Sequence, residues 1–135
     1  MNDKIFIDTN LLIYSCSDNQ IKKDAASNIL LSHSELHLSV QVINEFLAVA
    51  TNKLKMSVDE AISNAEIFMG VYTTHSIHTT TVINSFKIIK RYQYSNWDSL
   101  IIASALENDC EILFSEDMQH NQIIENKLKI INPFK

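Results

Sequence analysis

Four acidic residues of this 135-residue chain lie where a solvated carboxylate is unusual. Asp8 and Asp117 each follow a short apolar run that is typical of a buried strand. Asp98 opens the most apolar helical pattern, where the helix dipole favours an ionised carboxylate. Glu45 has valine at both i−3 and i+4, so it lies on an apolar helix stripe. We expect Glu45 to be largely buried, which is costly unless it is paired or binds a metal ion.

The chain offers few cations to pair with these acids. Arg91 is its single arginine, and no basic residue lies near Glu45 in the sequence. If the four acids instead share one pocket, they repel one another unless a divalent cation lies among them. Carboxylate oxygens are ligands that suit Mg²⁺ or Mn²⁺. One such ion, or two close together, can activate water against a phosphate ester and stabilise the leaving oxygen.

Structural roles stay open for some of these positions. Aspartate and asparagine both cap helices, so Asp8 could simply open the helix that follows it. Other acids fit a solvated helix face without further explanation, namely Asp24, Glu66, Glu107 and Glu125. We prefer the metal pocket because four acids in unusual places are hard to explain one at a time.

Strand-like and helix-like patterns alternate along the chain. Strands are predicted near residues 5–7, 36–40, 75–77, 112–115 and 128–131. Helices are predicted near residues 11–14, 20–33, 41–52, 57–69, 79–91 and 97–108. This order predicts an α/β fold with a central, mostly parallel sheet of about five strands and helices on both faces. Ligands of such sheets bind beyond the carboxyl ends of the strands, where Asp8 and Asp117 are expected.

Composition limits the alternatives. A chain of this length is expected to form one domain, spanning residues 1–135. One glycine and one proline disfavour sandwiches and barrels and exclude a glycine-rich phosphate loop. The net charge of −5 argues against binding nucleic acid by charge alone, but not against a nuclease whose metal ions meet the phosphate. Two isolated cysteines, no signal segment and no transmembrane run favour a reduced, cytoplasmic protein with no membrane partner.

Four sequence motifs resemble, in order and spacing, those of PIN domains. They are FIDTN at residues 6–10, NEF at 44–46, WDSLIIASA at 97–105 and LFSEDM at 113–118. The likeness is closest to the toxin ribonucleases of VapC type, and it extends to the closing INPF at residues 131–134. The combination is specific, although each motif alone is not.

The resemblance implies a PIN-like three-layer α/β/α sandwich with Mg²⁺- or Mn²⁺-dependent endoribonuclease activity on RNA. It implies that the catalytic and metal-binding residues are Asp8, Glu45, Asp98 and Asp117. It also implies supporting polar residues, which are Thr9, Asn10 and Ser115. A toxin of this kind would belong to a toxin-antitoxin system, form a homodimer and be inhibited by a cognate antitoxin protein.

The chain departs from the family pattern after the fourth acid. Toxin relatives often have glycine there, where this chain has His120 and Asn121. Asparagine tolerates a left-handed backbone, so we expect the turn to be kept. Glu116 stands beside Asp117, and we predict that Asp117 faces the metal because it occupies the family position.

Several other side chains are candidates for contact with RNA. The possible substrate contacts are Lys53, Lys55 and Arg91, which are equally consistent with solvated helix faces. Tyr92, Tyr94 and Trp97 could stack on a base, although core packing is an equal interpretation for Trp97. His75 and His78 are expected at the surface rather than in a zinc site. His120 lies near Asp117 and could touch substrate, but it too is expected at the surface.

Two rival functions are open to the same sequence. A phosphatase could use Asp8 as a covalent nucleophile, but the second aspartate expected two positions later is Asn10 here. A catalytically idle PIN-like module could bind RNA or protein without cutting. Dependence of the activity on Mg²⁺ or Mn²⁺ would separate the nuclease from the idle module.

Overall fold

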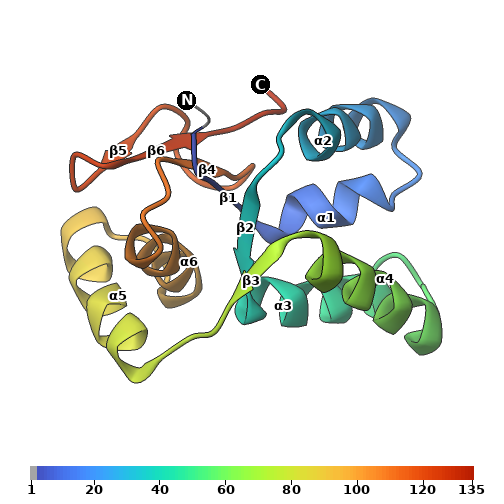
Figure 1. Ribbon diagram of the computed structural model, residues 1–135, viewed down its shortest axis with the longest axis horizontal. Coiled ribbons are helices and arrows are strands. Elements are labelled where there is room, and N and C mark those ends of the chain that lie inside the picture. The colour runs from blue at the N-terminus through green and yellow to red at the C-terminus, as the bar shows by residue number, and fades with distance from the viewer. Residues whose placement is uncertain (1–2) are drawn as a thin grey trace.

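The computed structural model describes residues 3–135, and six strands of this range form one sheet (Figure 1). The strand order is β3-β2-β1-β4-β6-β5. Four neighbouring pairs are parallel, and the edge pair β5–β6 is antiparallel. The strands are β1 (Ile5–Ile7), β2 (Leu36–Ser39), β3 (Thr73–His75), β4 (Ile112–Phe114), β5 (Ile123–Ile124) and β6 (Leu128–Ile131). The predicted α/β class with a mostly parallel sheet is confirmed.

The helices of this range lie on either side of the strands. Figure 1 shows α5 and α6 on one side and α1 to α4 on the other. The helices are α1 (Thr9–Ser15), α2 (Gln20–Ser32), α3 (Val40–Asn52), α4 (Val58–Val71), α5 (Thr79–Tyr92) and α6 (Asn96–Glu107). Among residues 3–135, none of the helices combines the length and the apolar character needed to cross a membrane.

The sheet has one strand more than the sequence predicted. β5 is only two residues long, and a turn at Glu125 and Asn126 joins it to β6. Both turn residues have positive φ, of 52° and 57°, as a type I′ hairpin requires. The expectation that Glu125 lies on a helix face was therefore wrong. The third strand, β3, also lies two residues earlier than predicted.

Helix boundaries follow local capping chemistry. The predicted capping serine Ser57 accepts a hydrogen bond from the Glu60 backbone N–H at 3.1 Å and opens α4. Ser95 does the same for the Asp98 N–H and opens α6. α4 continues to Val71, one residue beyond Gly70, which was expected to end it. Asn121 has φ of 69°, so the left-handed turn expected there is confirmed.

The register of the two central strands determines where the candidate site lies. Ile7 at the end of β1 is opposite Phe114 at the end of β4, so Asp8 lies next to Ser115. The Asp8 N–H donates to the Phe114 carbonyl at 3.0 Å. Phe6 and Ile7 are fully buried in the core. This packing fixes the position of the first acid.

Candidate active site

The four predicted acids line one cleft with a volume of about 500 Å³. They come from four separate segments of the chain, because Asp8 follows β1, Glu45 lies on α3, Asp98 opens α6 and Asp117 follows β4. Other predicted residues line the same cleft, namely Thr9, Asn10 and Lys53. The structure therefore brings together the residues that sequence reasoning proposed for one pocket.

Asp8 is the most buried of the four acids, with 4% of its surface exposed. Its Oδ1 accepts from the Thr9 N–H at 2.7 Å, and its Oδ2 accepts from the Ser115 hydroxyl at 2.8 Å. Burial raises the pKa of Asp8 to about 7, although these two hydrogen bonds oppose the rise. The negative charges of Asp98 and Glu45 make a smaller contribution to this rise. Asp8 is both the N-cap of α1 and a member of the cleft, so its two interpretations do not compete.

Glu45 is half-buried rather than largely buried, which corrects the expectation from the apolar stripe. Its Oε2 accepts from the Thr9 hydroxyl at 2.7 Å. Its Oε1 accepts from the Gln41 side-chain amide at 2.9 Å. Sequence reasoning missed Gln41, although its position one helical turn before Glu45 was a usable signal.

Asp98, in the first turn of α6, and Asp117, in the loop after β4, line the same cleft. Burial raises the pKa of Asp98, and the charges of Asp117 and Glu45 add to this rise. Asp117 is exposed, and its Oδ2 accepts from the Asn10 side-chain amide at 3.1 Å. The same Asn10 side chain accepts the Glu116 backbone N–H at 3.2 Å. Asn10 thus ties α1 to the loop that carries the fourth acid.

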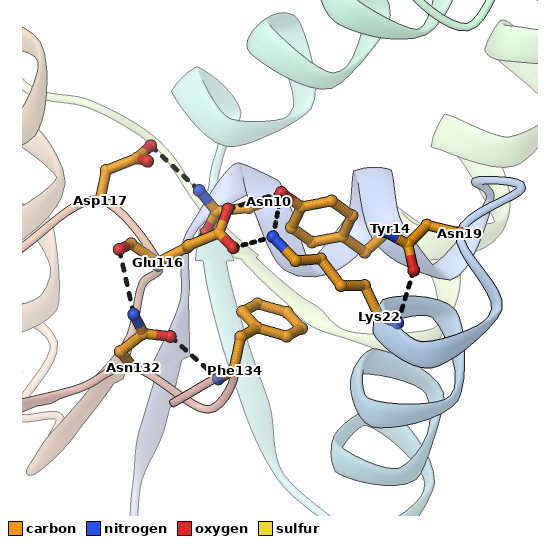
Figure 2. Close-up of polar contacts among 8 residues, drawn as sticks. All are labelled: Asn10, Tyr14, Asn19, Lys22, Glu116, Asp117, Asn132 and Phe134. Carbon is orange, nitrogen blue, oxygen red and sulfur yellow. Dashed lines mark hydrogen bonds and ion pairs between the residues drawn. The ribbon is translucent and has the colours of Figure 1, made fainter.

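Glu116 is held away from Asp117 by its own partners, as Figure 2 shows. Its carboxylate forms an ion pair with Lys22 and accepts from the Tyr14 hydroxyl at 2.6 Å. Burial raises the pKa of Glu116, but Lys22 and Tyr14 outweigh burial, and the net effect is a lowered pKa. The Asn132 side chain donates to the Glu116 carbonyl at 3.3 Å. Both acids line the cleft, but within residues 3–135 only Glu116 forms an ion pair, which leaves Asp117 as the acid available to a metal ion.

Because Glu116 and Asp117 have different partners, substitutions can distinguish their roles. On the ribonuclease activity that the resemblance implies, Asp117→Asn is expected to lower cleavage by about 100-fold or more, because a carboxylate of the cleft is lost. Glu116→Gln is expected to change it by less than about threefold, because glutamine can still contact Lys22 and Tyr14. The measurement is the initial rate of RNA cleavage for the two purified variants. A larger loss in Glu116→Gln would reverse the assignment.

The three predicted cationic residues differ in their relation to the cleft. Lys53 lines it, whereas Lys55 is exposed beyond α3 and does not. Arg91 lines a different cavity, where its Nη1 lies 3.2 Å from Glu125 Oε2. The structure does not bring Arg91 to the acidic cleft.

The position of Lys53 leads to a second testable expectation. On the ribonuclease activity that the resemblance implies, Lys53→Ala is expected to raise KM for RNA about fivefold with little change in kcat, because one cation that lines the cleft is lost. Arg91→Ala is the matched control and is expected to leave both constants unchanged. Steady-state kinetics on one short RNA would measure both, and an equal effect of the two substitutions would contradict this role for Lys53.

The three aromatic candidates for base stacking differ in their surroundings. The Tyr92 hydroxyl accepts the Glu125 N–H at 2.9 Å, and the Tyr94 hydroxyl accepts the Gln119 N–H at 3.1 Å. These two tyrosines support the segment between β4 and β6. Trp97 is 62% exposed, so the interpretation that it packs in the core was wrong.

The histidines only partly match the expectation of surface residues. His78 is exposed, whereas His75 is half-buried and stacks on His37 with 2.8 Å between His37 Nδ1 and His75 Nε2. His120 is also half-buried, and its Nδ1 accepts the Asn132 N–H at 2.9 Å. Burial lowers the pKa of His75, and the nearby His37 lowers it further.

The chemistry of the cleft fits a divalent cation. Within residues 3–135, no three acidic, imidazole or thiol side chains lie close enough to share one ion directly. Mg²⁺ does not need three such ligands, since it keeps several waters and is commonly held by one or two carboxylates. Burial raises the pKa values of Asp8 and Asp98, and repulsion from neighbouring acids adds to the rise. A cation among these oxygens would stabilise their ionised forms.

The sequence pattern of the PIN domain matches residues 5–125, and the chain therefore belongs to the PIN domain family. No curated protein sequence matches the chain. The family is one of nucleases that are typically metal-dependent.

Several solved structures share this fold at low sequence identity. The toxin VapC20 of Mycobacterium tuberculosis, described as cleaving the sarcin-ricin loop, has a TM-score of 0.72 and 16% identity over 84% of this chain and 92% of its own. A toxin-antitoxin complex from Klebsiella pneumoniae has a TM-score of 0.74 and 17% identity over 96% of this chain and 98% of its own. VapBC2 of Rickettsia felis, bound to a DNA fragment from its promoter, has a TM-score of 0.67 and 17% identity over 95% of this chain and 98% of its own.

Proposed function

We propose that this protein is a metal-dependent endoribonuclease that hydrolyses RNA phosphodiester bonds. The observation that carries the proposal is the convergence on one cleft of the four predicted carboxylates, which come from four segments of the chain. A fifth carboxylate, Glu116, also lines the cleft but is engaged by Lys22 and Tyr14. Two of the four have pKa values raised partly by the charge of the others. Such repulsion is typical of a site built for a cation rather than of a structural ion-pair network.

The side chains of the cleft divide into acids and the groups that hold them. Asp8, Glu45, Asp98 and Asp117 are the proposed ligands of Mg²⁺ or Mn²⁺, directly or through water. Ser115 orients Asp8, Thr9 orients Glu45 and Asn10 orients Asp117, each by a hydrogen bond of 2.7 to 3.1 Å. The ion, when bound, supplies activated water and stabilises the leaving oxygen. The chain itself then needs no nucleophilic side chain.

We propose further that the protein is the toxin of a toxin-antitoxin pair. The support is its fold, which it shares with VapC20 and with toxins solved in complex with antitoxins. Its proposed partners are RNA as substrate, a cognate antitoxin protein and a second copy of the chain. We propose a single PIN domain over residues 1–135 and a cytoplasmic location.

Cleavage of a structured RNA pool by the purified protein tests this function. We expect cleavage with Mg²⁺ or Mn²⁺ and none with EDTA, because the acids then lack the cation. Cleavage that proceeds equally well in EDTA would contradict the metal-dependent site. Inert protein under all three conditions would favour the idle binding module instead.

A further inference from the structure

A second groove borders the acidic cleft and has a volume of about 580 Å³. Its walls come from α3, from the start of α6 and from Ile77. Glu45 and Ala48 line both the groove and the acidic cleft, so the two adjoin each other. A strand of RNA with its phosphate at the acids would therefore have this groove beside it.

Trp97 forms one wall of the groove and is 62% exposed. It directly precedes Asp98, and its carbonyl accepts the Gln41 side-chain amide at 3.0 Å. This bond joins α6 to α3 in the wall of the groove. A large, exposed indole ring is thus held next to one of the proposed metal ligands.

Gln41 contributes an unpaired acceptor to the same wall. Its amide nitrogen donates to both Glu45 and the Trp97 carbonyl, so these two acceptors fix which way the amide points. Its Oε1 is buried and has no hydrogen-bond partner among the described residues. A buried, unpaired carbonyl is costly. A small shift of the Gln41 side chain would turn this oxygen toward the groove, and an occupant that brings an N–H donor would favour that shift.

We propose that this groove binds a nucleobase adjacent to the cleaved phosphate, with the base stacked on Trp97 and an N–H edge directed at Gln41. Every nucleobase has a flat π face for stacking and an N–H donor on its edge. An apolar side chain of a protein partner would leave Gln41 Oε1 unpaired. The inference rests on the proposed ribonuclease function and specifies how that site holds its substrate.

Trp97 is the single tryptophan of the chain, so its fluorescence reports on this groove alone. Short single-stranded oligoribonucleotides of A, C, G or U would be titrated into the Asp8→Asn protein with Mg²⁺. We expect the emission to change in a saturable manner, because a stacked base quenches and shields the indole. An abasic ribose-phosphate strand of equal length is the control, and it should cause no change.

Variants test the same contact through affinity, measured by anisotropy of a labelled strand. Trp97→Ala in the Asp8→Asn background is expected to weaken binding about tenfold, whereas Trp97→Phe keeps an aromatic face and should weaken it less than about threefold. Phe86→Ala is the matched control, since Phe86 is 51% exposed on α5 and lines neither the groove nor the cleft.

Three results would overturn the nucleobase assignment. These are binding without a change in emission, no binding of any strand, and a change in emission caused by an apolar helical peptide but by no oligonucleotide. The proposed function fails separately, if wild-type protein does not cleave RNA with Mg²⁺ or Mn²⁺. Wild-type cleavage with an unchanged KM in Trp97→Ala would reject the groove alone and leave the nuclease in place.

Discussion

Asp8→Asn is expected to lower metal-dependent RNA cleavage by about 1,000-fold, since a cation site is worth several kcal/mol of transition-state stabilisation. The substitution removes the most buried charge of the cleft while keeping the shape of the side chain. The amide oxygen can still accept from the Thr9 N–H, and the Ser115 hydroxyl can turn to accept from the new amide N–H. The fold should therefore persist, and the lost activity would report on charge.

Single-turnover cleavage with saturating Mg²⁺ measures this effect, with circular dichroism as the check on folding. Asp24→Asn is the matched control, because Asp24 is exposed on α2 and contacts only Gln20 among the hydrogen bonds found. We expect the control to cleave at the wild-type rate. Cleavage by Asp8→Asn within about tenfold of wild type would remove Asp8 from the active site.

Local sequence signals were sufficient for most of the fold. Short apolar runs at β1 and β4 and helical stripes between them predicted parallel strands, and the register opposite Phe114 then places Asp8 at the cleft. β5 was missed because two residues carry no periodicity and its turn lacks the usual glycine. Local pattern therefore predicts an element only when the element spans several residues.

The candidate site was predictable in its acids but not in their surroundings. Acids at strand ends stand out because burying a charge is rare. Glu116 forms an ion pair with Lys22, which is 94 residues away in the chain. A local sequence pattern cannot predict such a contact. The exposure of Trp97 likewise depends on where α3 lies beside α6. Such features arise from tertiary packing and need the structure.

Without divalent cation, the free energy of unfolding is expected to fall by about 3 kcal/mol as the pH rises from about 4 to about 7. The pKa of Asp8 is 3.8 in an unfolded chain and about 7 in the folded one, mainly because of burial. Between these values the folded state binds more protons than the unfolded state, so raising the pH favours unfolding. The raised pKa of Asp98 acts in the same direction, whereas the lowered pKa of Glu116 stabilises the fold above its unfolded value.

Urea denaturation in EDTA across this pH range measures the fall. Asp8→Asn should remove most of it and be more stable than wild type near pH 8, because its amide does not ionise. Mg²⁺ should stabilise wild type more near pH 8 than near pH 5, since at low pH protons occupy the oxygens that the ion would bind. If the free energy of unfolding changes with pH in the same way for wild type and Asp8→Asn, then ionising Asp8 does not destabilise the fold. The cleft would then lack the unfavourable buried charge that a bound cation is expected to stabilise.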